Sequence, residues 1–243
     1  MTAFPTLKFR TEGQVATVTL DRPDARNALN LPMCEDLLAV ARELKSGTTR
    51  LVFIRGAGPA FCAGADTKER ADKDAAWVRE RRMKAFAAYD AFESLEIPVI
   101  AVVEGAAMGA GVEICSICDF VIATPEAFFG TPEAQRGTIG ATQRLPRIVG
   151  RQLAKDMMYT GRRLTAEEAK AAGLVSRLVP KDRLEEEIAS VAKAILQAPA
   201  GAIRLAKRCI DLGTDTDRKG ALAAEIAAID EQLATGTWLG KKP

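Results

Sequence analysis

The stretch "IPVIAVVEGAAMGAGVEICSICDFVIAT" (residues 97–124) predicts a buried strand, a turn of small residues, a short helix and a second strand in immediate succession. Its first part, "IPVIAVV", is apolar throughout and rich in β-branched residues, which is typical of a strand covered on both faces. Gly105 ends this strand, and the small residues after it open into a helix. "FVIAT" at residues 120–124 predicts the next strand, so strand and helix alternate as in α/β folds.

The same alternation extends outward from this stretch in both directions. The elements predicted on its N-terminal side are strands at residues 15–20 and 51–54 and helices at residues 31–44 and 72–95. On the other side, Thr165 and Glu168 match the capping box at the start of a helix, and Gly173 stands where a left-handed cap would end it. The sequence therefore predicts an α/β architecture that continues to about residue 180.

The C-terminal quarter has a different pattern. From Leu184 onward it is helical almost throughout, with interruptions at "QAPAG" and "DLGTDTDRKG". A chain of 243 residues fits one large domain, or one core with an appendage. We predict a core over residues 1–180 that carries the active site, and a helical C-terminal region over residues 181–243.

Composition limits the partners that the protein can have. With 48% hydrophobic and 27% charged residues, a packed core is expected. The net charge of +2 predicts no nucleic-acid partner. The longest apolar region, residues 98–123, contains Glu104, Glu113 and Asp119, so no membrane partner is expected. The charged cluster "RERRMK" (residues 79–84) is interpreted as the solvated face of a helix.

The cysteines and the N-terminal residues indicate the compartment. The chain begins without a cationic segment followed by a long apolar run, so no secretory signal is expected. The 5 cysteines are an odd number scattered through apolar surroundings, which predicts free thiols in a reducing cytoplasm. Cys115 and Cys118 form a C-x-x-C, but it lies too far into the predicted helix for a redox pair, and packed core thiols are favoured.

The chain contains no histidine. A Ser-His-Asp triad, a Cys-His pair and a histidine metal site are therefore excluded, and no metal is expected. The "GAG" at residues 109–111 has no third glycine at the spacing of a dinucleotide site, so it indicates such a site only weakly. Acid–base chemistry must come from carboxylates, lysine, tyrosine, cysteine or the backbone.

Two carboxylates have sequence neighbours that make them candidates for that chemistry. Glu113 lies among apolar and small residues in "GAGVEICSIC", and Glu133 follows Thr131 and Pro132 in "FFGTPEAQRG". Either could instead be structural: Glu113 on a wet helix face or paired with an arginine, and Glu133 as a first-turn acid favoured by the helix dipole. If both converge in an apolar pocket, their pKa values would be raised and separated, which suits acid–base work near neutral pH.

Five segments carry a resemblance that extends over most of the chain. They are "DRPDARNALN" (21–30), "FCAGADTKE" (61–69), "PVIAVVEGAAMGAGVEICSICDFVIAT" (98–124), "FFGTPEAQRGTI" (128–139) and "TQRLPRIVGRQLAKDMMYTGRRLTAEEAKAAGLVSRLV" (142–179). Together they resemble the enoyl-CoA hydratase/isomerase family, also called the crotonase family. The resemblance implies an α/β fold of the ClpP/crotonase type, a spiral of ββα units with a helical C-terminal region.

The resemblance also implies a coenzyme A thioester substrate, whose carbonyl oxygen lies between two backbone N–H groups. One is implied at Ala65 in "AGAD" and the other at Ala110 in "GAG", where relatives usually have glycine. Alanine can serve there if its φ is negative, because the donor is the amide. Such an oxyanion hole stabilises the thioester enolate as its charge develops. The small residues of "FCAGAD" would then let a substrate oxygen reach the backbone.

Hydratases of the family use two glutamates, and Glu113 and Glu133 match both positions. In the implied mechanism a water lies between the two carboxylates. Glu113 orients it and takes its proton as it attacks Cβ, and Glu133 supplies the proton to Cα. Many relatives with other activities keep only one of these acids, so the presence of both favours hydration over isomerisation.

The resemblance implies that coenzyme A binds as part of the substrate, with no separate cofactor. The residues implied to contact it are Arg26, Ala28, Ala63, Asp66 and Lys68. A basic residue near the phosphates is expected from charge. Lys68 could equally be a solvated surface lysine.

Two departures from the family pattern affect the expected site. The loop at residues 137–143 ("GTIGATQ") is about three residues shorter than in most relatives, and it lies along the acyl pocket. The chain also stops where relatives commonly continue into one more helix, which would leave the site more open or covered otherwise. The resemblance implies a homotrimer, or a hexamer made of two trimers, assembled through the C-terminal region.

Enoyl-CoA hydratase is the leading functional hypothesis. Two alternatives remain open: another reaction on a coenzyme A thioester (isomerase, thioester hydrolase or lyase), and a catalytically quiet binding module. Product analysis would separate the first two, because only hydration adds a water while leaving the thioester intact. Detection of any turnover would exclude the third.

Overall fold

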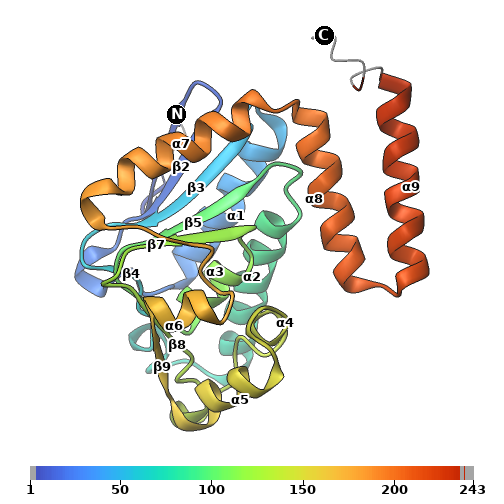
Figure 1. Cartoon of the computed structure of the whole chain (residues 1–243). Coiled ribbons are helices and arrows are strands. Elements are labelled where there is room, and N and C mark those ends of the chain that lie inside the picture. Colours follow the sequence, from blue (N-terminus) through green and yellow to red (C-terminus); the bar gives the residue numbers. More distant parts are fainter. Residues whose placement is uncertain (1–3, 236–237, 239–243) are drawn as a thin grey trace.

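The computed structural model describes residues 4–235 and residue 238 (Figure 1). In this part of the chain the strands form a larger and a smaller sheet. The larger sheet has the order β1 (Leu7–Glu12), β2 (Val15–Leu20), β3 (Leu51–Gly56), β5 (Val99–Val103), β7 (Phe120–Ala123) and β10 (Arg177–Leu178). β1 pairs antiparallel with β2, and the other neighbours are parallel.

The smaller sheet has the order β4 (Ala60–Cys62), β6 (Ala106–Met108), β8 (Phe128–Gly130) and β9 (Arg163–Thr165). β4, β6 and β8 are parallel, whereas β9 is antiparallel. Consecutive strands go to different sheets: β3 and β4, β5 and β6, and β7 and β8 each give one strand to each sheet. A helix follows each of the first two pairs, so the prediction of an α/β spiral of ββα units is confirmed.

The α-helices of the described residues are α1 (Leu31–Ser46), α2 (Ala75–Glu93), α3 (Ala110–Ser116), α4 (Leu145–Val149), α5 (Arg151–Thr160), α6 (Ala166–Ala171), α7 (Leu184–Gln197), α8 (Ala200–Asp215) and α9 (Arg218–Thr235). Helices α1, α2 and α3 pack on one face of the larger sheet, and α7 packs on the other. Alternate residues of β3 separate the two layers. Val52 and Ile54 belong to the main core with α1, α2 and α3, while Leu51 and Phe53 pack with α7.

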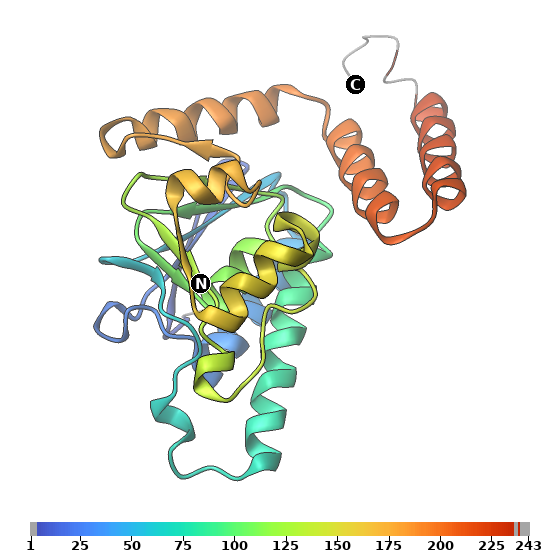
Figure 2. The ribbon, with the colours of Figure 1, turned by 60° about the horizontal axis from the view of Figure 1, so that its bottom comes forward.

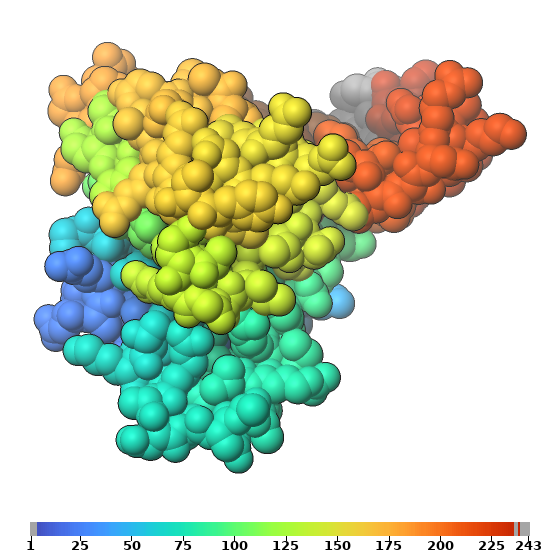
Figure 3. All heavy atoms as spheres, turned by 90° about the horizontal axis from the view of Figure 1, so that it is seen from below, coloured from blue at the N-terminus to red at the C-terminus, as the bar shows by residue number. Residues whose placement is uncertain are grey.

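The last two helices form an arm that leans away from the body (Figures 1 and 2). The two helices lie side by side, joined by ion pairs from Arg204 and Arg208 to Glu231. Seen as a surface, the arm projects from one corner of the molecule (Figure 3). Its exposed large apolar side chains are Ile210, Leu212, Leu222, Ile226, Ile229 and Leu233.

The local predictions agree with these elements within a few residues. The helix predicted at residues 72–95 is α2, which begins after Asp74, whose carboxylate accepts the Trp77 N–H. The capping box of Thr165 and Glu168 is present, and Gly173 has a φ of +86°. The second predicted interruption of the C-terminal helices is shorter than expected, because α8 continues to Asp215.

Candidate active site

The candidate site lies where three strands of the smaller sheet end. β4, β6 and β8 run parallel, so their carboxyl ends meet at one edge of the sheet. The segments that follow are residues 63–66, the start of α3 and residues 131–133. The ends of two of these strands are joined directly, since the N–H of Gly109, just after β6, donates to the carbonyl of Gly130 in β8 at 2.8 Å. Functional residues commonly gather at this edge of α/β sheets.

Glycine is required at two points where these segments touch. A Cβ at Gly64 would lie 3.2 Å from the Met108 carbonyl oxygen, and one at Gly109 would lie 2.6 Å from Oε1 of Glu133. The φ angles are +103° at Gly64 and +52° at Gly109, in the region that favours glycine. The "AGAD" and "GAG" turns therefore approach each other more closely than residues with side chains would allow.

The Ala65 N–H is not engaged by the described part of the chain. Leu29 lies beside it as in a parallel ladder, where the Leu29 N–H donates to Gly64 and its carbonyl accepts from Asp66, at 2.8 and 2.9 Å. Backbone groups of successive extended residues alternate in direction. The Ala65 amide therefore faces the opposite side, where a cleft opens.

Ala110 lines the same cleft. It is the first residue of α3, so its N–H has no acceptor within the helix. Its φ is negative, since it is not among the residues with positive φ, and this meets the condition set for alanine at this position. The two amides predicted for the oxyanion hole thus border one cleft.

The cleft contains about 770 Å³ of space free of protein atoms, including its open mouth. Helix α2 forms one wall, with Val78, Arg82, Ala85 and Tyr89 at intervals of three or four residues on one helix face. The facing wall contains Ala65, Ala110, Glu113 and Glu133. The predicted acids and the predicted amides are therefore brought together, although they come from three separate segments.

Glu113 projects from the first turn of α3. Its Oε1 accepts a hydrogen bond of 3.0 Å from the Ala141 N–H. Burial raises the pKa of the Glu113 carboxyl, while the bond from Ala141 and the positive charges of Arg144 and Arg82 oppose that rise. Glu113 lines the wall of a cleft and is partly exposed, and it forms no ion pair with an arginine among the described residues.

Glu133 lies against the two glycine turns that flank it. A Cβ added at Gly109 would lie 2.6 Å from its Oε1, and one added at Gly140 would lie 3.1 Å from the same oxygen. Its Oε2 is buried without a hydrogen-bond partner in the described residues. Burial raises the pKa of this carboxyl, and the negative charge of Glu113 raises it further. An orphaned buried oxygen is costly unless the group is protonated or a ligand pairs with it.

Tyr89 is a further cleft residue that the sequence analysis did not identify. Its side chain is fully buried, and its hydroxyl has no partner within the described part of the chain. Burial, together with the nearby charge of Glu113, raises its pKa well above 10. The phenol is therefore a neutral O–H donor in the cleft that both acids line.

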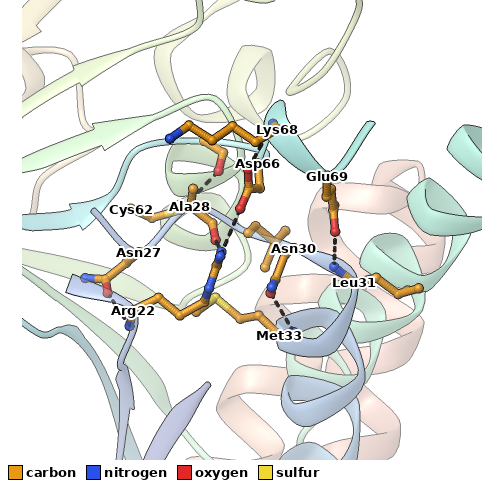
Figure 4. A network of polar contacts seen from close by, with 12 residues as sticks. Arg22, Asn27, Ala28, Asn30, Leu31, Met33, Cys62, Asp66, Lys68 and Glu69 are labelled. Carbon is orange, nitrogen blue, oxygen red and sulfur yellow. Dashed lines mark hydrogen bonds and ion pairs between the residues drawn. The ribbon is translucent and has the colours of Figure 1, made fainter. Parts of the chain in front are cut away.

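Three of the residues predicted to contact coenzyme A, Ala28, Asp66 and Lys68, lie at the "AGAD" turn (Figure 4). Asp66 accepts an ion-paired hydrogen bond of 3.0 Å from Arg22, whose guanidinium also donates to the Ala28 carbonyl. The other carboxylate oxygen of Asp66 accepts the Lys68 N–H at 3.1 Å. Asp66 therefore holds the turn in place, while the Lys68 side chain is exposed.

Arg26 and Ala63 belong to the same structure. The Ala63 N–H donates to the Arg26 carbonyl at 2.9 Å, and the Arg26 side chain is exposed. Next to Arg26, the buried Asn27 amide donates to Ala57 and Ala60 at 2.8 Å each. Arg22 and Asn27 were missed as positioning residues, although both stand in "DRPDARNALN".

The interpretation of "RERRMK" as a solvated face is wrong for two of its residues. Arg81 is buried, and its guanidinium donates to Glu69 at 2.8 Å and to the Leu29 carbonyl. Arg82 is half-buried and lines the cleft. The side chains at these positions turn inward because α2 places them on the stripe that faces the site.

The C-x-x-C cysteines are packed thiols, as expected. Cys115 is buried, and Cys118 is half-buried and donates to the Ile114 carbonyl at 3.2 Å. Burial raises the pKa of both, so neither is a ready thiolate.

Within residues 4–235, no group of three or more metal-ligating acids and cysteines comes together. In the same range, no helix is both long and apolar enough to cross a membrane.

Sequence comparison identifies the family of this site. A sequence model described as enoyl-CoA hydratase/isomerase matches residues 10–236. This chain belongs to the enoyl-CoA hydratase/isomerase family. The short-chain-enoyl-CoA hydratase of Clostridium acetobutylicum is 37% identical over 229 residues, covering 92% of this chain and 88% of that protein.

Solved structures of the enoyl-CoA hydratase/isomerase family have the same fold. The enoyl-CoA hydratase of Bacillus anthracis superimposes with a TM-score of 0.89 at 37% identity, over 93% of this chain and 90% of that one. A protein of Thermobifida fusca, solved in complex with acetoacetyl-CoA, superimposes with a TM-score of 0.88 at 27% identity, over 95% of each chain. The expectation of the crotonase fold is thus confirmed.

Proposed function

We propose that this chain is an enoyl-CoA hydratase, which adds water across the 2,3 double bond of a 2-enoyl-CoA thioester. The observation that carries the proposal is one cleft bordered by two uncommitted backbone amides, Ala65 and Ala110, and by two carboxyls, Glu113 and Glu133. Coenzyme A enters as part of the substrate, and no separate cofactor takes part.

The two amides act on the thioester carbonyl oxygen. As water attacks Cβ, negative charge moves onto this oxygen, and preorganised donors stabilise it by roughly 3–4 kcal/mol each. Ala110 is the first residue of α3, so the positive end of the helix dipole also stabilises this charge. The substrate oxygen would approach closely because Gly64 and Gly109 leave the backbone uncovered.

The environments of the two carboxyls support separate roles. Glu113 accepts the Ala141 N–H, which stabilises its charged form, so it is suited to orient the water and take its proton. Glu133 has a buried oxygen without a protein partner and a like charge nearby, so its protonated form is favoured. Glu133 then gives its proton to Cα of the enolate.

Coenzyme A would bind along the "AGAD" turn. The exposed cationic side chains of Arg26 and Lys68 are available to its phosphates, and the backbone near Ala28 and Ala63 to its pantetheine. Asp66 serves this site indirectly, through its ion pair with Arg22.

The apolar face of the α8–α9 arm supports assembly. We propose a homotrimer, or a hexamer of two trimers, in which Leu222, Ile226 and Ile229 are covered by neighbouring subunits. Sedimentation of the purified protein at micromolar concentration tests this, and a monomer would contradict it. The free cysteines support a reducing compartment such as the cytoplasm.

Isomerisation is the second candidate, because the family that the chain belongs to includes isomerases. Incubation with 2-enoyl and 3-enoyl thioesters, followed by mass spectrometry, distinguishes the two. Hydration raises the product mass by one water and retains the thioester, whereas isomerisation leaves the mass unchanged. A protein inert on thioesters of all chain lengths would refute both.

A further inference from the structure

A second hollow adjoins the cleft on the side of Glu113. It contains about 990 Å³ of space, including its open mouth, between α2 and residues 139–144. Arg82, Phe86 and Glu113 line both hollows, so the two are continuous. Because Glu113 is placed to act at Cβ of the acyl group, atoms beyond Cβ would enter this second hollow.

Most of the second hollow is apolar, and the arginines that line it differ in how their positive charge is neutralised. Its apolar wall comes from Val78, Met83, Phe86 and Ile139. Arg144 lies at its edge and is neutralised by Asp90 and Glu93, at 2.7 and 2.6 Å. Arg79 is exposed to solvent, which screens its charge.

Arg82 differs from the arginines around it. Its Nη2 donates to the Thr138 hydroxyl at 2.6 Å and to the Ile139 carbonyl, and both acceptors are neutral. In the described part of the chain it forms no ion pair, whereas its neighbour Arg81 is paired with Glu69. Its Nε and Nη1 donate to no described residue, so three N–H groups of the fork remain open.

Arg82 has no hydrogen-bonded counter-ion among the described residues, although its charge acts on Glu113 and Glu133, which line the same cleft. The free edge of a guanidinium fits a carboxylate with two parallel hydrogen bonds. On the basis of the proposed hydratase function, we propose that Arg82 binds a carboxylate at the far end of a short acyl chain. The preferred substrates are then 2-enoyl-CoA thioesters of dicarboxylic acids.

A phosphate of coenzyme A is the less favoured partner for Arg82. The segments predicted to grip coenzyme A lie between residues 26 and 68, and no described residue of that range lines the second hollow. Arg82 and Glu113 line both hollows, so a carboxylate beyond Cβ could reach Arg82 from the acyl side.

The test compares two thioesters of equal carbon number. Glutaconyl-CoA ends in a carboxylate, and 2-pentenoyl-CoA ends in a methyl group. We expect the intact protein to favour glutaconyl-CoA in kcat/KM, and Arg82→Gln to lower that preference about 10- to 100-fold, as for hydrogen bonds between charged groups. The preference is a ratio, so it is insensitive to effects of Arg82 on Glu113 that both substrates share.

Two further variants distinguish the hydrogen bonds of the Arg82 guanidinium from the effect of positive charge alone. Arg79→Gln removes an exposed charge at the rim of the same hollow, and the preference is expected to change less than about twofold. Arg82→Lys keeps the charge without the fork, and an intermediate preference is expected. An equal loss in Arg79→Gln and Arg82→Gln would overturn the role of Arg82.

The outcomes distinguish this inference from the proposed function. Hydration of 2-pentenoyl-CoA without preference for glutaconyl-CoA would overturn the inference and leave the hydratase function intact. If neither thioester is hydrated, the hydratase function fails, and calorimetric binding of glutaryl-CoA and pentanoyl-CoA to the unmodified protein decides the inference. Tighter binding of glutaryl-CoA by tenfold or more supports it, and equal affinities contradict it.

Discussion

The Ala141 N–H donates to the carboxylate of Glu113 at 3.0 Å, and Ala141 has a left-handed φ of +52°. A non-glycine residue rarely adopts this conformation, which costs about 1–2 kcal/mol. The loop at residues 137–143 thus supplies a contact to the candidate base. The strained φ of Ala141 orients its N–H toward the carboxylate of Glu113.

Loss of this amide should raise the pKa of Glu113. In Ala141→Pro the N–H is absent, and proline, whose φ is fixed at about −65°, also moves the backbone from its φ of +52°. The charged carboxylate therefore loses its donor, and the acid limb of kcat/KM should move to higher pH. Ala141→Gly retains the N–H and is the control, with an unshifted limb. The pH profile of hydration measures both, and identical limbs in the two variants would exclude the proposed effect of Ala141.

The contact between Gly109 and Glu133 predicts a loss of activity that backbone strain alone does not explain. In Gly109→Ala the new Cβ would lie 2.6 Å from Oε1 of Glu133 and displace the carboxyl, so kcat should fall by about 10²-fold or more. Gly137→Ala is a matched control, because Gly137 also has a positive φ (+66°) but no atom within 4 Å of such a Cβ.

Both substitutions should cost about 1 kcal/mol in the free energy of unfolding, since alanine is strained at positive φ. Only Gly109→Ala should lose turnover. Equal activity in the two variants would show that Glu133 is not held by the glycine turn.

Burial of the two acids should make the protein less stable at higher pH. Glu113 and Glu133 have pKa values raised above 4.5 in the folded state, so folding favours their protonated forms. The stability that they contribute is fully present below pH 4.5 and is lost as the pH rises through the raised pKa values. We therefore expect the free energy of unfolding of the double variant Glu113→Gln, Glu133→Gln, measured in urea, to increase relative to that of the natural protein as the pH rises. A gain that shrinks with pH would contradict the raised pKa values.

The buried pair of Arg81 and Glu69 should matter more to stability than a surface pair. Arg81→Met leaves Glu69 half-buried without its partner, and breaking such a pair typically costs about 3–5 kcal/mol. Arg183→Met removes an exposed pair with Glu186 and should cost less than about 1 kcal/mol. Denaturant unfolding compares the two, and equal losses would rule out a structural role for Arg81.

Local signals predicted the elements well because they depend on near neighbours. The apolar run at residues 97–103 produced β5, and Thr165 with Glu168 predicted the start of α6. The convergence of Glu113 and Glu133 could not be derived from spacing, because it depends on the parallel pairing of β6 and β8. The family resemblance supplied that information.

The predictions that failed concern residues whose surroundings are set by tertiary packing rather than by their neighbours in the sequence. "RERRMK" contains mostly charges, so it indicated a solvated face, but Arg81 finds Glu69 and the Leu29 carbonyl through tertiary packing. Nothing near Arg82 in the sequence indicates the loop that it contacts, 56 residues later. Tyr89 was missed because a lone tyrosine in an amphipathic helix gives no functional signal.

The central claim is that Glu113 and Glu133 act together beside the amides of Ala65 and Ala110. Its most direct test is the loss of enoyl-thioester absorbance with 2-butenoyl-CoA, measured for the natural protein and for Glu113→Gln and Glu133→Gln. We predict hydration by the natural protein, and a fall in kcat of about 10²- to 10⁴-fold in each variant while the fold is retained. Full activity in either folded variant would contradict the account.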